Sequence, residues 1–338
     1  MKMQMKKRFN KNILIIGSGN IAKRHIKNIK ALDRDCKIFC VSSSGKKLTK
    51  KNIGVDQIID SFSEAKKNSF EKVIVASPSS LHIKHAMPFL KRGTSVLIEK
   101  PLSTTLKKAK KILHDSNEIE DCYVGYNLRF IKSLNFFKKC INSNKFGEIN
   151  TVFCEVGQYL PEWRKTHYLK TVSANKELGG GALLELSHEL DYLLWIFGIP
   201  SDVFCYLSKS KKLKLKVEDQ VNSFLKFKNG LIINLHLDML NRNPKRFCRV
   251  ETVKGTLVWD FYKNNVSFQK PHSQKEILFK ENKIDRNKCY LDEIRAFIKK
   301  ENQEEKKLVS LNHGFKILQI IDALRESNLR KKEVNIQN

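Results

Sequence analysis

The chain has 338 residues, of which 41% are hydrophobic and 29% charged, and its formal net charge is +29. This length and balance predict about two globular domains, each able to bury its own core. No apolar run approaches the ~18 residues that cross a bilayer. The stretch Ile13–Ile16 is also too short for the apolar core of a signal peptide. We therefore expect a cytoplasmic protein without membrane insertion.

Two interpretations fit the positive charge. A nucleic-acid or membrane-surface binder is one, and a general lysine bias on solvated faces is the other. The lysines are scattered from end to end and no aromatic-interleaved basic motif is present, so we favour the second and expect no nucleic-acid partner. The charge would still favour anionic ligands such as phosphates and sugar acids. The cysteines form no C-x-x-C pair and no His cluster has zinc-ligand spacing, which predicts buried thiols and no metal site.

Short apolar runs alternate with helical spacing through the first third of the chain. Strands are predicted at 12–16, 37–42, 73–76, 94–98 and 122–125, with an apolar pair at 58–59. Helices are predicted at 21–32, 63–68, 81–92 and 106–115. The first helix carries an apolar stripe of Ile21, His25, Ile29 and Leu32. This alternation indicates a parallel sheet covered on both faces, a doubly wound α/β domain over residues 1–125.

The pattern changes after about residue 126. Strand character appears at 151–156, 203–207, 220–227, 231–237, 246–253 and 257–261, and Asn229-Gly230 predicts a hairpin turn between two of these runs. Helices are predicted at 128–141, 182–197, 290–300 and 314–329. We therefore expect an α+β domain over residues 126–338, closely docked on the first, with a large open and mostly antiparallel sheet.

A glycine-rich loop follows the first strand. Gly17-Ser18-Gly19-Asn20-Ile21-Ala22 has the G-x-G-x-x-A pattern of a Rossmann dinucleotide-binding turn. Gly17 permits the tight turn, Gly19 lets the backbone approach a pyrophosphate, and Ala22 allows close packing of the helix on the strand. The pyrophosphate would lie on the positive end of the helix dipole. The alternative is a plain tight turn between strand and helix.

The second strand ends without the acid that usually binds the ribose hydroxyls. The segment from Ser42 to Lys47 contains serines and then lysines. Without a carboxylate, Lys46 or Lys47 could attract the 2′-phosphate of NADP, so NAD or NADP is expected, slightly in favour of NADP. Two solvated lysines are nearly as good an explanation.

Glu99-Lys100-Pro101 directly follows the strand at 94–98. A lysine at the carboxyl end of a parallel strand points into the crevice where ligands bind. An oxidised nicotinamide ring beside it would depress its pKa, and such a lysine can take the proton of a substrate hydroxyl as the hydride leaves. An ordinary exposed loop lysine is the alternative.

The predicted helix after Gly179-Gly180-Gly181 gathers its polar residues in its middle. Glu185, His188 and Asp191 are three apart, so neighbours in this series share a helix face. Such a cluster in an otherwise apolar helix suggests a site. A buried histidine satisfied by its own acidic neighbour explains it equally well.

Taken together, these stretches resemble the Gfo/Idh/MocA oxidoreductase family, which includes glucose–fructose oxidoreductase and inositol 2-dehydrogenase. The resemblance covers nearly the whole chain. It rests on the loop at 17–22, Ser77-Pro78-Ser79-Ser80-Leu81-His82, Glu99-Lys100-Pro101, Gly125-Tyr126-Asn127-Leu128-Arg129-Phe130 and the segment from Gly179 to Asp191.

The resemblance implies a Rossmann domain followed by an α+β domain whose open sheet often mediates dimers or tetramers. It implies that Lys100 is the general acid/base and that His188 contacts the substrate or helps to protonate it. The residues that would line the nicotinamide side of the cofactor are Ser77, Pro78, His82, Glu99 and Asn127.

One position departs from the family pattern. An Asp usually stands four residues before the His, but Leu184 stands there, and Glu185 is the nearest carboxylate. Either Glu185 takes the Asp role through a one-residue shift or that role is missing. His188 and Asp191 keep the usual three-residue step, and we expect Asp191 to be a substrate-contacting residue.

The segment from Tyr159 to Tyr168 is similar to the substrate-facing loop of family members linked to surface-polysaccharide or nonulosonic-acid sugars. Arg164 could pair with a carboxylate or phosphate and Trp163 could stack on a sugar face, with Tyr168 nearby. An ordinary surface loop is the alternative.

We therefore predict an NAD(P)-dependent oxidoreductase that exchanges a hydride with a secondary alcohol or ketone of a sugar or nucleotide sugar, and a homo-oligomer. A non-catalytic dinucleotide-binding sensor or scaffold on the same fold is the second hypothesis, motivated by the missing Asp.

Overall fold

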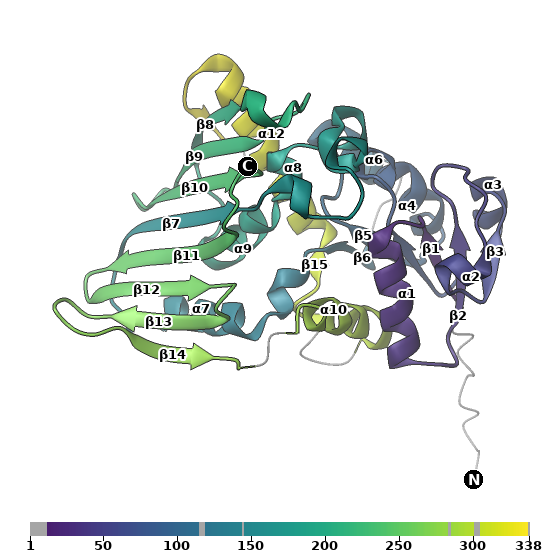
Figure 1. Cartoon of the computed structure of the whole chain (residues 1–338), viewed down its shortest axis with the longest axis horizontal. Helices are drawn as coiled ribbons and strands as arrows, with labels where there is room; N and C mark the ends of the chain where they lie inside the picture. Colours follow the sequence, from purple (N-terminus) through teal and green to yellow (C-terminus); the bar gives the residue numbers. More distant parts are fainter. Residues whose placement is uncertain (1–11, 115–118, 144, 283–284, 301–304, 337–338) are drawn as a thin grey trace, which may run out of the picture.

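A computed structural model describes residues 12–114, 119–143, 145–282, 285–300 and 305–336. Two sheets lie side by side, with helices between them (Figure 1). Among these residues no helix is long and apolar enough to cross a membrane.

The first sheet has seven strands in the order β15-β6-β5-β4-β1-β2-β3. Its strands β1 to β6 are all parallel, and β15 runs antiparallel to β6. The strands are β1 (Asn12–Ile16), β2 (Lys37–Val41), β3 (Gln57–Ile59), β4 (Lys72–Val75), β5 (Ser95–Glu99), β6 (Cys122–Gly125) and β15 (Val309–Ser310). The order reverses between β1 and β4, which is the crevice where doubly wound sheets bind ligands.

Helices cover both faces of this sheet. The helices of the first part of the chain are α1 (Asn20–Leu32), α2 (Lys50–Ile53), α3 (Phe62–Ala65), α4 (His82–Leu90), α5 (Leu106–Ala109) and α6 (Lys111–His114). On one face, Ile15 and Leu97 pack with Ile29 of α1 and with Phe297 of the later helix α10 (Lys288–Lys299). On the other face, β4 and β5 pack with α4 and with α12 (Leu311–Arg330). Strand side chains are apolar on both faces because both faces are buried.

The second sheet has nine strands in the order β14-β13-β12-β11-β7-β10-β9-β8-β16. All neighbours are antiparallel except β7 and β10, which run parallel. The strands are β7 (Ile149–Gly157), β8 (Asp202–Ser208), β9 (Gln220–Lys226), β10 (Ile232–Asp238), β11 (Lys245–Thr252), β12 (Gly255–Asp260), β13 (Asn265–Gln269), β14 (Glu276–Lys280) and β16 (Val334–Asn335). The expected fold class, a doubly wound parallel sheet followed by a large open sheet, is confirmed.

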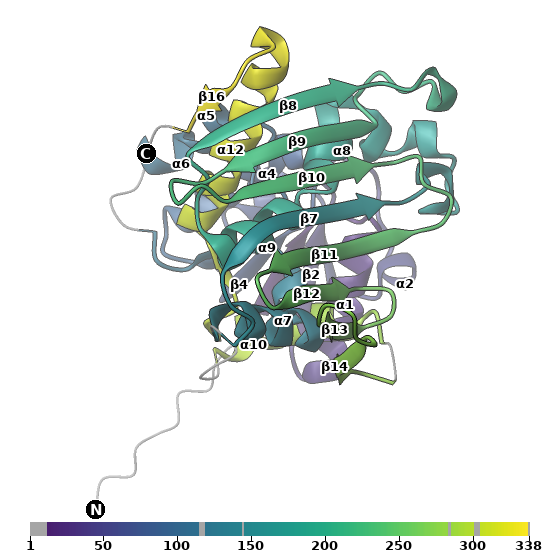
Figure 2. The same ribbon diagram turned by 90° about the vertical axis from the view of Figure 1, so that its left-hand side faces the viewer.

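Within the described residues, helices cover only the inner face of this sheet. The helices α7 (Lys132–Asn142), α8 (Ala182–Glu185) and α9 (His188–Phe197) lie between the two sheets (Figure 1). Figure 2 shows the outer face with strands β7 to β11 in front of these helices. Along the strands inward residues are buried and outward ones exposed, as Val221, Asn222 and Phe224 of β9 illustrate. This period-two alternation is what a sheet with one solvated face requires.

Several predicted elements differ in extent. The helix predicted at 182–197 is interrupted at Leu186–Ser187, the one at 106–115 is divided into α5 and α6 with its end at 115 outside the described residues, and the one at 63–68 is a single turn. The short α2 and the strands β13 to β16 were not anticipated.

Candidate active site

The glycine loop joins β1 to α1 with its two glycines in different roles. Gly17 has φ +121°, its N–H donates to the Val41 carbonyl at 2.9 Å, and a Cβ there would collide with the Ala76 main chain. Gly19 is the N-cap of α1, offers no side chain to the first amides, and has open space where a Cβ would lie. The positive end of a thirteen-residue helix that begins at Asn20 and Ile21 is therefore free for an anionic group. These residues fit a dinucleotide pyrophosphate.

The loop after β2 carries the residues that would meet the adenosine ribose. Ser42 is buried, and its Oγ accepts a hydrogen bond from the Ser44 amide at 3.3 Å. Lys46 and Lys47 are exposed. The loop presents hydroxyls and cations and no carboxylate between positions 42 and 47.

His82 ties the loop after β4 to the loop after β5. Its Nε2 lies 2.8 Å from the Ser77 carbonyl oxygen and its Nδ1 lies 2.8 Å from the Pro101 carbonyl oxygen. Burial lowers the pKa of His82, although both carbonyls favour a proton on the ring. The Ser77 hydroxyl lies 2.9 Å from Nδ1 of His85, and Pro78 precedes the short turn that leads into α4. The ends of β4 and β5 are thereby fixed against each other.

Lys100 follows β5 and reaches the second part of the chain. Its Nζ donates to the main-chain carbonyl of Glu185 at 2.7 Å. Glu185 is the last residue of α8, so its carbonyl is one that the interrupted helix leaves without a partner in the next turn. No interaction of the Glu185 carboxylate appears among the described contacts.

His188 begins α9, directly after the interruption. The Tyr126 ring packs edge-on against the His188 ring with centroids 5.5 Å apart, and the Tyr126 hydroxyl donates to Ser187 Oγ at 3.2 Å. Ser187 Oγ in turn donates to the Leu184 carbonyl at 2.9 Å. Nδ1 of His188 is buried and has no hydrogen-bond partner within the described structure.

Burial and nearby positive charges both disfavour the protonated form of His188. Burial lowers the pKa of His188 well below its ordinary value, and the Lys100 and Arg246 charges lower it further. Lys100 and His188 therefore lie within electrostatic range of each other, one from the end of β5 and one from the start of α9. Lys100 thus contacts the segment that carries His188, through the carbonyl of Glu185, three residues before that histidine.

Asn127 and Asp191 have partners inside the protein. Asn127 is buried, and its Nδ2 lies 3.4 Å from Cys289 Sγ. The Asp191 carboxylate has no exposed surface: Arg129 holds it through Nε and Nη2, and Nε2 of His313 lies 3.1 Å away. Asp191 was expected to face the substrate; its carboxylate is fully buried and paired with Arg129.

The loop from Tyr159 to Tyr168 lies further out. Arg164 is exposed, Trp163 is partly buried with its Nε1 unpaired in the described part of the chain, and the Tyr168 hydroxyl donates to the Leu213 carbonyl at 3.1 Å. The structure does not bring Arg164 into contact with Lys100 or His188 through any described interaction.

Two features of the site were missed at the level of sequence. His25 of α1 is fully buried, and its Nε2 lies 2.5 Å from Oε1 of Glu99. Arg246 of β11 forms a 2.7 Å ion pair with Glu189, which is fully buried beside His188. The signal for the first pair was a histidine within the apolar stripe of the first helix, since a buried imidazole needs a partner. This signal was not used to predict the pair. No local pattern indicated the second.

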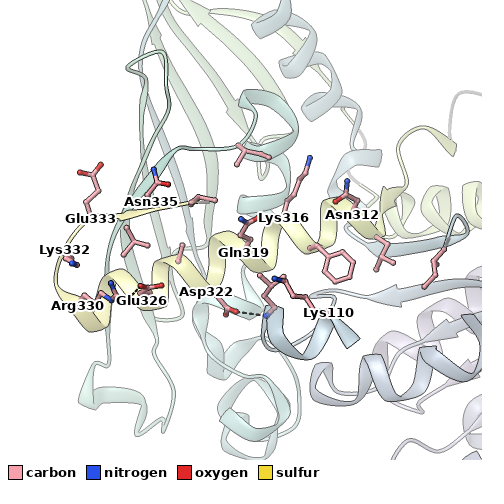
Figure 3. A pocket seen from close by; sticks show the side chains of 18 residues that line it. Lys110, Asn312, Lys316, Gln319, Asp322, Glu326, Arg330, Lys332, Glu333 and Asn335 are labelled. Carbon is pink, nitrogen blue, oxygen red and sulfur yellow. Dashed lines mark hydrogen bonds and ion pairs between the residues drawn. The ribbon is translucent and has the colours of Figure 1, made fainter. Parts of the chain in front are cut away.

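A cavity of about 1150 Å³ lies elsewhere, along the outer side of α12 (Figure 3). Residues such as Lys110, Lys316 and Arg330 line it, and none of the residues discussed above does. This cavity therefore lies apart from the titratable groups at the strand ends. No group of three His, Cys, Asp or Glu side chains in the described residues could hold a metal ion.

Comparison with known proteins agrees with this arrangement. An oxidoreductase family described as having an NAD-binding Rossmann fold matches residues 11–126, and the C-terminal alpha/beta domain of the same family matches residues 138–336. Glucose-6-phosphate 3-dehydrogenase of Bacillus subtilis is 27% identical over 67% of each chain. The scyllo-inositol 2-dehydrogenase (NADP(+)) of the same organism is 30% identical, over 40% of this chain and 37% of its own.

Solved structures share the whole fold. A levoglucosan dehydrogenase in complex with NADH and levoglucosan has a TM-score of 0.82 at 17% identity and covers 97% of this chain and 99% of its own. The WlbA dehydrogenase of Bordetella pertussis, in complex with NADH and UDP-GlcNAcA, has a TM-score of 0.79 at 20% identity and covers 96% and 99%. Since both halves of the family match in order over nearly all of the sequence, the chain belongs to the Gfo/Idh/MocA family of NAD(P)-dependent oxidoreductases.

Proposed function

We propose that this enzyme exchanges a hydride between NAD(P) and a secondary alcohol or ketone of a sugar or nucleotide sugar, with Lys100 as the general acid/base. The observation that carries the proposal is the hydrogen bond from Lys100 Nζ, at the carboxyl end of β5, to the Glu185 carbonyl, three residues before His188. Relatives that act on glucose 6-phosphate and inositol support the substrate class.

The proton transfer follows from the surroundings of Lys100. As a free amine, Nζ can accept the proton of a substrate hydroxyl, and as an ammonium it can return a proton to a ketone oxygen. The Glu185 carbonyl, 2.7 Å away, orients Nζ in either state. Glu185 thus belongs to the proposed catalytic set through its main chain. His188, whose buried Nδ1 has no partner within the described residues, would orient the substrate hydroxyl.

The cofactor would be held along the ends of the parallel strands. Gly17, Gly19, Asn20 and Ile21 would hold the pyrophosphate and Ser42 the ribose. The nicotinamide side would be lined by Ser77, Pro78, His82, Glu99 and Asn127. When bound, the nicotinamide supplies or accepts the hydride. The NADH bound in the solved structures named above supports NAD(P) as the cofactor. The exposed Lys46 and Lys47 support a slight preference for NADP. Separate titrations with NAD⁺ and NADP⁺ would test this preference.

The substrate would enter between the two sheets. We propose that Trp163, Arg164 and Tyr168 border its entrance, with Arg164 reaching an anionic group once a substrate is present. Asp191 fits a positioning role, because its carboxylate is committed to Arg129. We propose that the boundary between the two domains lies between residues 125 and 126.

The outer face of the second sheet is the proposed surface of a homodimer or tetramer. Tyr206, Phe224 and Ile232 expose 50%, 49% and 42% of their surface there. Exposed apolar side chains on one face mark an interface in a soluble protein. Light scattering should give a dimer or tetramer, and Phe224→Asp should shift it toward the monomer. We also propose a cytoplasmic location, which the eight buried cysteines, none of them in a disulfide, support, and no nucleic-acid partner.

The experiment that tests the function is turnover by the purified protein. NAD⁺ or NADP⁺ with a panel of sugars, uronic acids, hexose phosphates and UDP-sugars should yield reduced cofactor for at least one class, measured by its absorbance. Tight cofactor binding without turnover on any member would favour the non-catalytic sensor or scaffold. That second hypothesis rests on Leu184, which stands where the family usually has Asp.

A further inference from the structure

A buried pair of side chains joins the glycine-loop helix to the strand that ends in Lys100. His25 of α1 has no exposed surface, and its Nε2 lies 2.5 Å from Oε1 of Glu99 at the end of β5. The other carboxylate oxygen of Glu99, Oε2, accepts a hydrogen bond from the Lys100 amide at 3.3 Å. With Glu99 ionised, His25 Nε2 is the donor of this bond, because a carboxylate only accepts hydrogen bonds.

The surroundings of Glu99 favour its ionised form. Burial raises the pKa of Glu99, but the His25 hydrogen bond and charge outweigh burial, with help from Lys100 and His82, and the pKa ends below its ordinary value. The pKa of Glu293 of α10, a second buried carboxyl nearby, is shifted in the opposite direction. Burial, then the charges of Glu99 and Asp191, hold the pKa of Glu293 well above its ordinary value. The surroundings thus favour the ionised form of Glu99 and the protonated form of Glu293.

The position of the anion gives it a function. Glu99 lies at the carboxyl end of β5, next to β4 and close to the point where the strand order reverses between β1 and β4. The proposed nicotinamide site lies at this edge of the sheet. The oxidised nicotinamide ring carries a positive charge that the reduced ring lacks. A buried negative charge nearby therefore stabilises one redox form of the cofactor and leaves the other nearly unaffected.

We infer that His25 is a positioning residue that holds Glu99 as a fixed anion, and that this anion makes the protein bind the oxidised dinucleotide more tightly relative to the reduced one. The inference rests on the proposed function, because it requires the cofactor to bind with its nicotinamide beside Glu99. It adds a specific residue, His25, and a measurable property, the ratio of the dissociation constants of the two redox forms.

Binding titrations test the inference without any substrate. Quenching or enhancement of NADH fluorescence gives its dissociation constant, and competition gives that of NAD⁺, with the NADP pair used instead if the wild type prefers it. Glu99→Gln keeps the shape and removes the charge, so we expect the preference for the oxidised form to fall roughly tenfold, mainly through weaker binding of NAD⁺. His25→Phe removes the donor and should lower the preference in the same direction.

The double variant and a matched control separate this role from a structural one. If His25 acts through Glu99, combining the two substitutions should lower the preference no further than Glu99→Gln alone. The control is Asn287→Ala, which removes the amide pair of Asn287 with Asn28 one turn further along α1 and should leave the ratio unchanged. Melting temperatures of all variants show whether each is folded.

Each outcome has a distinct meaning. An unchanged ratio in a folded Glu99→Gln variant that still binds both forms overturns the inference and leaves the proposed function intact. Additive losses in the double variant overturn the assignment of His25. A wild-type protein that binds neither NAD(H) nor NADP(H) overturns the proposed function itself, and the inference with it.

Discussion

The side-chain ammonium of Lys100 donates to the main-chain carbonyl of Glu185 at 2.7 Å, although 85 positions separate the two residues. The bond joins the last residues of the parallel sheet to the helix segment that carries His188. A main-chain acceptor is present whatever side chain stands at position 185. The geometry of Lys100 therefore depends on where α8 ends and not on the acid that the sequence drew attention to.

Replacing Lys100 by Met should lower kcat by about 100- to 10,000-fold, because the proton would lose its positioned carrier. Dissociation constants of the cofactor should change little. Steady-state kinetics with the substrate found in the panel checks the first expectation and fluorescence titration the second. Lys107→Met, which alters an exposed lysine a few residues later, is the control. Full turnover by the Lys100 variant would contradict the assigned role.

Replacing Glu185 by Ala should leave kcat within about tenfold of the wild-type value, because the carbonyl that holds Lys100 remains. The measurement is kcat beside that of Glu185→Gln. A loss as large as that of the Lys100 variant would instead assign the family's Asp role to the Glu185 carboxylate, through the one-residue shift considered above.

The two glycines of the loop should respond differently to substitution. Gly19→Val adds bulk to open space at the start of α1, so it should weaken dinucleotide binding by at least tenfold and leave the melting temperature nearly unchanged. Gly17→Ala should lower the melting temperature, since its Cβ meets the Ala76 main chain at a positive φ. Titration and thermal unfolding of both variants check this. Equal effects on stability would contradict it.

Replacing Asp191 by Asn should destabilise the fold by about 3–5 kcal/mol, because Arg129 would keep a buried charge without its partner. Urea unfolding measures the change. The control, Glu326→Gln, breaks an exposed pair with Arg330 and should cost about 0.5 kcal/mol or less. If Asp191→Asn changed the free energy of unfolding little but raised KM strongly, Asp191 would instead be a substrate-contacting residue.

Stability should fall as the pH falls from about 6.5 to about 4. Burial, followed by the charges of His82 and Lys84, lowers the pKa of His85 to about 4. Over this interval His85 binds a proton in the unfolded chain but not in the folded protein. The free energy of unfolding therefore drops by up to about 1.4 kcal/mol per pH unit for this group. Urea unfolding across this range, compared with His85→Gln, should show a shallower slope in the variant. Identical slopes would contradict the assignment.

The repeating parts of the fold were predictable because local patterns determine them. The runs at 12–16 and 122–125 became β1 and β6 without change, and Asn229-Gly230 forms the turn between β9 and β10. The resemblance to the Gfo/Idh/MocA family is confirmed by the matches to both of its domains. Each of these features depends on residues close together in sequence.

The unpredicted parts depend on tertiary contacts. The break between α8 and α9 lies at Ser187, whose hydroxyl donates back to Leu184 and accepts from Tyr126, a residue 61 positions away. The local sequence predicts a continuous helix, because its polarity pattern cannot show the contact with Tyr126, which lies far away in the chain. The pairing of Arg246 with Glu189 is equally invisible, since the two residues come from β11 and α9.

The short strand β15 has a consequence for dividing this protein. Val309 and Ser310, from the far end of the chain, pair with β6 and close the outer edge of the first sheet. A fragment that stops at residue 125 would leave that edge with unpaired amides and carbonyls, and exposed strand edges recruit other chains. Expressed alone, the fragment of residues 1–125 should therefore self-associate. Adding the segment around β15 as a separate peptide should restore its solubility.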